Sequence, residues 1–390
     1  MNRRTTVGIH DLSFASAEFV LTHATLAAHN GARLAKYHTG IGQQAMSVPA
    51  ADEDVVTLAA TAAQPVVQRH GTDRIRTVLF ATESSIDQSK SAGVYVHSLL
   101  ELPAATRVVE LKQACYAATA GLQLALALVT RDPGQQVLVI GSDISRYPLD
   151  SPGEATQGAA AVALLVAADP ALLRIEHPSG LYTADIMDFW RPNYLSTALV
   201  NGQESISAYL QALEGTWNDY TKHGGRPLGD FAAICYHQPF TTMAHKAHRH
   251  LLRHCGHQSE HPATTALTCT TAYNTQLGNS YTASMYLALA GLLDHADDLT
   301  GQPVGLMSYG SGSVAEFFAG TVVPGYRRHL RRTAHRTVVD RRQALTYARY
   351  RDLHETQLPT DGGDHPLPPQ TTGPFRLAAL TGHKRIYTPR

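Results

Sequence analysis

The stretch "ACYAATAGLQLALALVTRDPGQQVLVIGSD", residues 114–143, joins a helix pattern rich in small residues to a buried strand pattern. Cys115 opens the helix, and the strand begins 22 positions later, after a Pro-Gly turn. A second stretch, "NSYTASMYLALAGLLDHADDLTGQPVGLMSYGSG" at residues 279–312, opens its helix at Ser280 and reaches its strand 24 positions later. The two stretches therefore predict that one helix–strand unit is used twice in the fold.

Short runs of apolar and β-branched residues predict the strands around these two units. Their hydrophobicity is continuous rather than alternating, which is typical of strands buried on both faces. The runs lie at residues 76–85, 105–114, 135–143, 160–167, 230–240 and 303–313. Helix-period segments separate them, so the sequence predicts an α/β fold. A chain of 390 residues is too long for one ordinary core, and we expect two halves, residues 1–168 and 169–390.

The charge balance narrows the possible partners. Lys and Arg together number 32, as do Asp and Glu, so no basic field is available to attract nucleic acid over a distance. No apolar run approaches the roughly 20 residues of a membrane-spanning helix, and the N-terminus lacks the apolar stretch of a signal peptide. The four cysteines form no Cys-x-x-Cys pair. We therefore expect a soluble protein of the reducing cytoplasm, with neither nucleic acid nor a membrane as partner.

Titratable residues stand where predicted strands end. Glu83 ends the strand before Cys115 and precedes it by 32 positions, and His237 precedes Ser280 by 43 positions. Sheets of α/β proteins usually bind ligands at the edge formed by the carboxyl ends of their strands. The duplicated fold therefore predicts that these side chains gather at one edge, together with Asn279.

Two interpretations of Cys115 are open. A cysteine in a segment rich in Ala and Leu is most often a small buried hydrophobe. At a helix start, however, unpaired N–H groups and the positive end of the helix dipole favour a thiolate nucleophile. Glu83 and His237 are the candidate bases, although either one alone could be structural, and the turn "SYGSGS" (308–313) is the candidate oxyanion site. A hydrolase could also combine Cys, His and Glu, but it would not need a duplicated half.

Two segments carry no predicted chemistry. The histidine-rich tract "HKAHRHLLRHCGHQSEH", residues 245–261, raises the question of a zinc site. Because its spacing is irregular and no Cys-x-x-Cys partner lies nearby, we expect a surface helix and no bound metal. From residue 323 onward the chain is basic and helical and then rich in Pro and Gly, which predicts a solvated helix followed by an irregular surface tail. No glycine-rich phosphate loop occurs.

Several motifs resemble those of one family. They are "ATESSIDQSKS", "ELKQACYAATAGLQ", "GEATQGAAAVALLV", "YHQPFTTMAHKA", "GNSYTAS" and "SYGSGSVAEFF", in the family's order and spacing. Over nearly its whole length the chain resembles the 3-hydroxy-3-methylglutaryl-CoA synthases of the thiolase superfamily. The resemblance implies the thiolase-like, five-layered αβαβα fold built from two duplicated halves, working as a homodimer.

The resemblance also implies roles for individual residues. Cys115 would be the nucleophile that acetyl-CoA acylates, and Glu83 would be the acid and base. His237 would position and polarise the acetoacetyl thioester. A carboxylate in a partly desolvated pocket has a raised pKa, which suits removal of a proton from the weakly acidic methyl group of the acetyl thioester.

Further residues would surround the acyl groups. By the same resemblance Asn279 would bind the acetoacetyl moiety, and Tyr147 would face the acyl group. Backbone N–H groups at Cys115 and at Ser311, which follows Gly310, would form the oxyanion site. No cofactor is implied, since coenzyme A thioesters are the substrates.

The implied activity is that of an acyltransferase of the mevalonate pathway of isoprenoid biosynthesis, using acetyl-CoA and acetoacetyl-CoA. An alternative keeps the chemistry but takes β-keto thioesters on an acyl carrier protein, as in polyketide β-branching, or another acyl acceptor. A catalytically silent scaffold is a third hypothesis, which the intact Cys, Glu and His disfavour.

Departures from the family pattern leave the acceptor open. Relatives often carry a lysine-rich "PFTKMGKKA", whereas this chain reads "PFTTMAHKA". Thr242, Ala244 and His245 leave only Lys246 to meet a coenzyme A phosphate.

Overall fold

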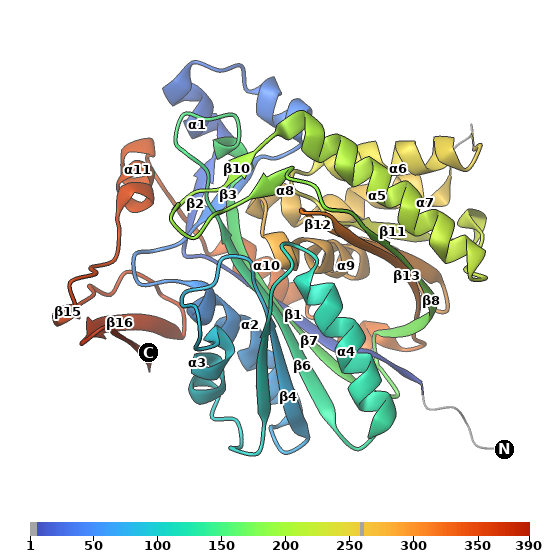
Figure 1. Cartoon of the computed structure of the whole chain (residues 1–390), viewed down its shortest axis with the longest axis horizontal. Coiled ribbons are helices and arrows are strands. Elements are labelled where there is room, and N and C mark those ends of the chain that lie inside the picture. The colour runs from blue at the N-terminus through green and yellow to red at the C-terminus, as the bar shows by residue number, and fades with distance from the viewer. Residues whose placement is uncertain (1–5, 258–260) are drawn as a thin grey trace.

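A computed structural model describes residues 6–257 and 261–390 of the chain. Its centre is a mixed sheet of nine strands, whose two halves are visible in Figure 1. Across the sheet the order is β11 (Ala233–Tyr236), β12 (Pro303–Gly310), β13 (Val314–Val322), β8 (Leu173–Thr183), β1 (Val7–Ser16), β7 (Gly158–Ala168), β6 (Gln136–Ser145), β4 (Ile75–Ala81) and β5 (Arg107–Leu111). All of the predicted runs form strands, but β1, β8 and β13 lie outside those runs.

The strand order repeats within the sheet. In the first half β4 runs parallel to β6, and β6, β7 and β1 then pair antiparallel. In the second half β11 runs parallel to β12, and β12, β13 and β8 pair antiparallel in the same way. The predicted duplication is therefore confirmed, while the boundary between residues 168 and 169 stays a prediction. The halves join where β1 meets β8, at Gly8, whose backbone approaches Leu173 so closely that a Cβ would lie 2.0 Å from the Leu173 oxygen.

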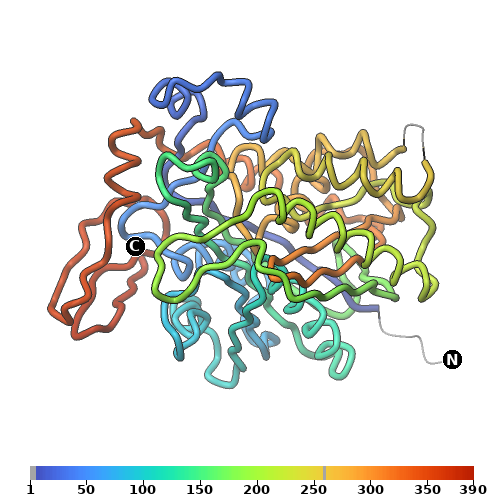
Figure 2. Tube along the Cα trace, turned by 45° about the horizontal axis from the view of Figure 1, so that its top comes forward, coloured from blue at the N-terminus to red at the C-terminus, as the bar shows by residue number. Residues whose placement is uncertain are grey.

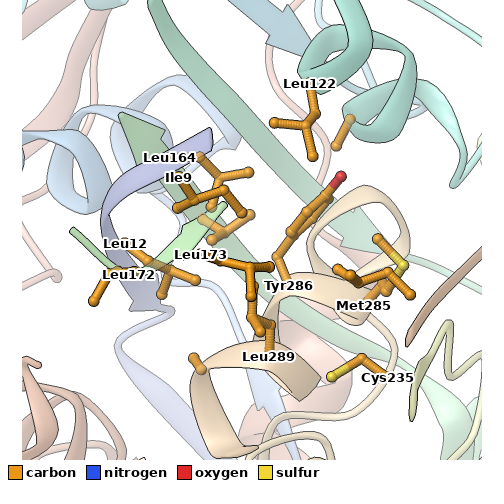
Figure 3. Packing of buried hydrophobic residues seen from close by; sticks show 14 of the residues in the cluster. Ile9, Leu12, Leu122, Leu164, Leu172, Leu173, Cys235, Met285, Tyr286 and Leu289 are labelled. Atoms are coloured by element: carbon orange, nitrogen blue, oxygen red, sulfur yellow. The ribbon is translucent and has the colours of Figure 1, made fainter. Parts of the chain in front are cut away.

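Two helices, one from each repeated unit, form the middle layer. They are α4 (Ala117–Arg131) and α9 (Ser284–His295). Figure 3 shows Tyr286 of α9 between Leu122 of α4 and Leu289 of α9, with Ile9 and Leu164 of the sheet to one side. Since the inner faces of both sheet halves contribute to this one cluster, burying the two helices joins the halves into a single core.

Helices also cover the outer face of each half. In the first half α2 (Val55–His70) and α3 (Ala92–Leu99) pack on side chains such as Phe80 and Ile140. In the second half α5 (Gly202–Lys222), α6 (Thr242–His254) and α7 (Pro262–Thr271) pack on side chains such as Tyr236 and Phe317. Successive strand residues face opposite layers, and the result is the predicted five-layered αβαβα arrangement.

The helix α2 begins with a side-chain cap, whereas α4, next to the predicted nucleophile, does not. Asp54 caps α2, because its side chain accepts from the N–H groups of Val56 and Thr57 in a capping box. No side chain caps α4, which begins two residues after Cys115. Side-chain capping is therefore absent where the predicted nucleophile lies.

Smaller elements surround this core. They are β2 (Phe19–Thr22), α1 (His23–Asn30), a π-helical turn (Lys36–Ile41), β3 (Ala45–Val48), β9 (Phe189–Trp190), β10 (Leu199–Val200), α8 (Asn274–Leu277), α10 (Arg332–Asp340), β14 (Gln343–Ala344), α11 (Tyr347–Glu355), β15 (His365–Pro366), β16 (Phe375–Thr381) and β17 (Lys384–Pro389). In Figure 2 the red C-terminal segment lies on the opposite side of the molecule from the yellow helices α6 and α7.

The predicted basic helical segment is confirmed, and most of α10 is exposed, but the prediction that the tail is irregular throughout is wrong. The basic segment forms two helices, α10 and α11, and the tail forms a three-stranded sheet of β15, β16 and β17. Arg331, at the start of α10, is nearly buried because it pairs with Asp11 of β1, at 3.0 Å from Nε to Oδ1. Thr371 and Thr372 donate hydrogen bonds to carboxylates near the start of the chain. These partners lie more than three hundred residues away, so local composition could not reveal them.

One helical segment of the described residues, Ala114–Arg131, has the length and composition of a membrane span. It coincides with the middle-layer helix α4, whose position between the two sheet halves accounts for its apolar character.

Candidate active site

Cys115 and Glu83 are in direct contact. Glu83 follows β4, Cys115 lies between β5 and α4, and the parallel pairing of β4 with β5 brings the two strand ends together. The Cys115 thiol donates a hydrogen bond to Glu83 Oε2 at an Sγ–O distance of 3.1 Å. Both side chains stay partly accessible, so a substrate can reach them.

The loop that carries Cys115 is tightly built. Ala114 has a φ of 43°, in the left-handed region, and the Tyr116 N–H donates to the Gln113 oxygen. Gly310, at the end of β12, lies against this loop: a Cβ there would come within 2.5 Å of the Gln113 oxygen. Only glycine at position 310 lets the Gly-Ser-Gly turn approach the nucleophile loop this closely.

Cys115 is protonated in the pair with Glu83, in contrast to the thiolate expected from the helix start. Burial, followed by the charge and hydrogen bond of Glu83, raises the pKa of the Cys115 thiol well above its ordinary value. Burial and then the charge of Asp143 raise the pKa of Glu83 to about 8. The resting cysteine is therefore a neutral thiol, because desolvation and a neighbouring carboxylate both disfavour a second negative charge, despite the helix start.

Asp143, near the end of β6, was not predicted from the sequence as a site residue. It is fully buried and accepts hydrogen bonds from the hydroxyls of Thr82, Ser84 and Thr282. It also accepts from the Glu83 backbone N–H at 2.9 Å. Asp143 thus fixes the Glu83 loop to the segment that begins α9, and its place at the end of a buried strand was the available signal.

His237 follows β11, in the second half. Burial lowers the pKa of its imidazole to about 3, so the ring is neutral. Its backbone N–H donates to the Met307 oxygen, and its backbone oxygen accepts from the Tyr209 hydroxyl. In the described part of the chain no hydrogen bond uses the ring nitrogens, which leaves them for a bound molecule. The Tyr209 ring stacks with the His237 ring at a centroid distance of 6.4 Å and packs on Tyr309 at 4.9 Å. Gly310, the residue after Tyr309, lies against the Cys115 loop, so His237 lies in the same region as the nucleophile.

Asn279 and Tyr147, the two residues predicted to bind the acyl groups, are both buried. The buried Asn279 accepts from the Tyr281 N–H through Oδ1 and donates its own N–H to the Thr156 oxygen. Burial, followed by the charges of Glu83 and Cys115, raises the pKa of Tyr147, so its hydroxyl stays protonated beside the pair. Phe189 packs between the rings of Tyr147 and Tyr281, with centroid distances of 6.1 and 5.8 Å, and so connects Tyr147 to the segment of Asn279.

The turn that contains Ser311 is held by hydrogen bonds with Gln113 and with Asp188. The Gln113 amide donates to the Ser311 oxygen at 3.3 Å. The Gly312 N–H donates to Asp188 Oδ1 at 3.0 Å, and the Tyr309 hydroxyl donates to Asp188 Oδ2 at 2.8 Å. Asp188, which is buried and was not predicted, thus fixes the turn, while no hydrogen bond among the described residues engages the Ser311 N–H.

Among the departures from the family pattern, Thr242 makes a contact that joins two segments. Thr242 donates its hydroxyl to the Gly40 oxygen at 2.9 Å, which ties α6 to the π-helical turn. A Cβ on Gly42 would collide with Thr242, so the two segments are closely packed. Lys246 lies one turn further along α6, half-buried, with its Nζ 5.0 Å from the centre of the Phe240 ring.

The histidine-rich tract forms packing contacts. The buried His248 is hydrogen-bonded with the Tyr236 hydroxyl and with Thr264, and His250 pairs with Glu214. His261 Nε2 donates to the Leu228 oxygen. Residues 258–260 lie outside the described residues, and the rest of the tract contributes to no group of three or more ligands that could hold a metal.

Two family models match the chain. Residues 3–171 match the N-terminal hydroxymethylglutaryl-coenzyme A synthase model, and residues 258–352 match the C-terminal one. The chain is 40% identical over 360 residues to hydroxymethylglutaryl-CoA synthase of Enterococcus faecalis, covering 91% of this chain and 93% of that one. It is 33% identical over 320 residues to the polyketide biosynthesis 3-hydroxy-3-methylglutaryl-ACP synthase of Bacillus subtilis, covering 76% of each.

Solved structures with similar folds support the same family. A crystal structure of HMG-CoA synthase complexed with CoA superimposes with a TM-score of 0.94 and 38% identity, covering 99% of this chain and all of that one. The HMG synthase of the curacin biosynthetic pathway, in complex with an acetyl donor-ACP, gives 0.91 and 29% with the same coverage. The chain therefore belongs to the hydroxymethylglutaryl-CoA synthase family and has its thiolase-like fold.

Proposed function

We propose that this protein is an acyltransferase that condenses acetyl-CoA with acetoacetyl-CoA through an acetyl thioester on Cys115. The products would be 3-hydroxy-3-methylglutaryl-CoA and free coenzyme A. The observation that supports this most directly is the hydrogen bond from the Cys115 thiol to Glu83 Oε2, at the edge where a neutral His237 and Asn279 also lie. The close relatives named for this activity support the choice of substrates.

In the first step Glu83 accepts the Cys115 proton as sulfur attacks the acetyl carbonyl. The carbon–sulfur bond to coenzyme A breaks, and the leaving thiolate takes a proton from Glu83. A carboxylate whose pKa is about 8 suits both transfers, because it gains and loses a proton easily near neutral pH. Because the raised pKa keeps Cys115 a neutral thiol, its attack depends on this proton transfer to Glu83.

In the second step Glu83 removes a proton from the acetyl methyl group. The enolate carbon attacks the ketone of acetoacetyl-CoA, the resulting alkoxide takes a proton, and water then releases the product from Cys115. The neutral His237 ring would donate an N–H to an oxygen of the acceptor without giving up its proton. Backbone N–H groups at Cys115 and Ser311 would stabilise the enolate oxygen, by about 3 kcal/mol for each well-placed donor.

A second copy of the chain is the proposed partner. Strand β5 ends the sheet and pairs only with β4 among the described strands. Apolar side chains are exposed on and beside it, at Val94, Val109 and Leu124. A free strand edge with apolar neighbours is a surface that a homodimer would cover. We further place the reaction in the cytoplasm and in the mevalonate pathway, as the source of the C6 precursor of isoprenoids.

The carrier-protein alternative has its own support. The Bacillus subtilis relative is named an ACP synthase, and the curacin-pathway enzyme was solved with a donor ACP. In this chain Thr242 is bonded to Gly40, and Lys246 lies against Phe240, so the start of α6 offers little free charge to a phosphate. Coenzyme A substrates remain the better supported, because the relatives at 38–40% identity are the CoA enzymes.

Mass spectrometry of the intact protein tests the proposal. Incubation with acetyl-CoA should add one acetyl group, which Cys115→Ala should lack. Addition of acetoacetyl-CoA should then remove the label and yield the condensed thioester. A label that persists with acetoacetyl-CoA but is consumed by an acetoacetylated carrier protein would favour the alternative.

A further inference from the structure

Hydrogen bonds to the buried carboxylate of Glu316 hold the start of α4, next to the nucleophile. Tyr116, the residue after Cys115, donates its phenolic O–H to Glu316 Oε2 at 2.8 Å. Gln123, two turns further along α4, donates its side-chain amide to Glu316 Oε1 at 2.6 Å. Glu316 lies in β13 and is 2% exposed, so both of its oxygens are engaged inside the protein.

This network crosses between the two halves of the molecule. Tyr116 and Gln123 belong to the first repeated unit, whereas Glu316 lies 200 and 193 positions further along the chain. On the other side of Cys115, the Gln113 amide donates to the Ser311 oxygen, in the turn between β12 and β13. The loop of the nucleophile is therefore fastened to the same strand pair on both sides of Cys115.

Glu316 affects the position of Cys115 and is not among the causes of its raised pKa. The rise of the Cys115 pKa comes from burial, from Glu83 and from Asp143. Burial raises the pKa of Glu316, while hydrogen bonds from Ser179, Tyr116 and Gln123 lower it. A carboxylate that receives several donors and is sealed by packing holds those donors at fixed positions.

We propose that Glu316 is a positioning residue for Cys115. Through Tyr116 and Gln123 it fixes the first turns of α4, and so keeps Sγ within hydrogen-bond distance of Glu83 Oε2. The expected effect on turnover rests on the proposed function. The position of the thiol can be measured without it, by alkylation.

The test is Glu316→Ala, which removes both hydrogen bonds. Turnover per acetylatable site should fall by about tenfold to a hundredfold, because a displaced nucleophile no longer meets the acetyl carbonyl and Glu83 in line. KM should change by less than about threefold, since no substrate contact is removed. Iodoacetamide should alkylate Cys115 faster than in the wild type, since the thiol is released from its contact with Glu83. Counting active sites by acetylation corrects for any unfolded fraction.

Two further variants separate positioning from general stability. Glu316→Gln keeps an acceptor for Tyr116, and rotation of the Gln123 amide restores the second bond, so this variant should recover most of the turnover. Tyr273→Phe is the control: it removes a more deeply buried bond from a tyrosine to a carboxylate, at 2.6 Å from Asp294, away from the nucleophile loop. It should leave alkylation and turnover at wild-type values.

The proposal is overturned if Glu316→Ala alkylates Cys115 at the wild-type rate and turns over normally, or if Tyr273→Phe has an equal effect. Labelling of the fully buried Cys235 in Glu316→Ala would show general loosening and would also overturn it. If wild-type protein takes no acetyl group from acetyl-CoA, the proposed function fails, and the alkylation comparison still decides the role of Glu316.

Discussion

Glu83 and Asp143 are two carboxylates joined through one backbone group: the Glu83 N–H donates to Asp143 Oδ1 at 2.9 Å. The charge of Asp143 is, after burial, the main cause that raises the pKa of Glu83 to about 8. The same aspartate receives the hydroxyls of Thr82 and Thr282, from both sides of the site. One buried residue therefore sets both the position and the basicity of the proposed base.

Asp143→Asn tests that relationship. Removing the charge should lower the pKa of Glu83, so the base becomes ionised at lower pH. The rate at which acetylated enzyme condenses should rise with pH through this pKa, and the midpoint should move below its wild-type position near pH 8. Single-turnover rates across pH measure it. Because the amide also loses hydrogen bonds, the midpoint rather than the absolute rate is decisive, and an unmoved midpoint would contradict the assignment.

Glu83→Ala should separate acetylation from condensation. Glu83 raises the pKa of Cys115, so its removal lowers that pKa, and the thiol can lose its proton to solvent instead of to Glu83. Acetylation should therefore persist at a reduced rate. Condensation should fall by roughly 100-fold to 10,000-fold, the usual effect of losing a general base. The acetyl label and the condensed product are measured in the same reaction. Asp87→Ala, an exposed carboxylate of the same loop, is the control and should behave as wild type. Normal product formation by Glu83→Ala would remove Glu83 from the mechanism.

Gly310→Ala should disrupt the nucleophile loop. Its Cβ would lie 2.5 Å from the Gln113 oxygen and 2.7 Å from the Tyr116 nitrogen, both backbone atoms that cannot move aside cheaply. We expect turnover to fall by about a hundredfold, because Cys115 is displaced from its partners. Gly229→Ala is the matched control, since a Cβ there meets nothing within 4 Å. Equal activities of the two variants would show that the close approach is unimportant.

Arg331→Ala should destabilise the fold. It leaves the buried Asp11 charge without its main partner, which costs about 3–5 kcal/mol of unfolding free energy in comparable pairs. Arg336→Ala, in the same helix but exposed and paired with Asp340, should change it by less than about 0.5 kcal/mol. Urea unfolding measures both variants. Similar losses of unfolding free energy in the two variants would show that the buried Arg331–Asp11 pair contributes no more than the exposed pair.

The same pair predicts a pH dependence. Burial alone would raise the pKa of Asp11, but Arg331 and Arg69 bring it below its ordinary value of 3.8. The wild type should therefore hold this contribution at pH values above about 4 and lose it as pH falls through the lower folded pKa. Arg331→Ala should lack this acid-dependent part of the unfolding curve. If both proteins lose stability in parallel below pH 4, the loss comes from other groups.

Lys246→Ala distinguishes the two acceptors. Lys246 is half-buried against Phe240, at the start of the helix tied to the π-helical turn. If free coenzyme A thioesters are the substrates, losing its charge should raise their KM about tenfold, the value of one charge-assisted contact. Steady-state kinetics with acetyl-CoA and with an acetylated carrier protein measure it. An unchanged KM together with faster turnover of the carrier-protein thioester would favour the β-branching alternative.

The strand ends explain what the sequence could predict about the site. Glu83 and Cys115 follow two continuous apolar runs, and parallel strands end at a common edge, so their contact at 3.1 Å follows from pattern and fold class. His237 follows a run of the same kind in the second half. Asp143 ends such a run as well, but nothing in its own segment shows that Thr282, 139 positions away, completes its hydrogen bonds.

Other features depend on contacts that no local pattern encodes. The sequence predicts the basic helix around Arg331, but not that Arg331 itself is nearly buried against the carboxylate of Asp11, 320 positions earlier. The thiolate predicted for Cys115 followed from the helix start alone, and the burial and the neighbouring Glu83 that reverse it become visible only in three dimensions. Sequence periodicity shows neither which distant residues become hydrogen-bond partners nor how strongly a side chain is desolvated.

The hydrogen bonds of Thr371 and Thr372 bear on the order in which the protein is made. Thr372 donates to Glu18, and Thr371 donates to Glu53, two carboxylates that leave the ribosome more than three hundred residues earlier. Burying such groups without donors is costly. During synthesis these two carboxylates therefore lack their threonine donors until residues near the end of the chain are translated. A nascent chain halted before Thr371 should be a good substrate for chaperones and proteases, even though it already carries Cys115, Glu83 and His237.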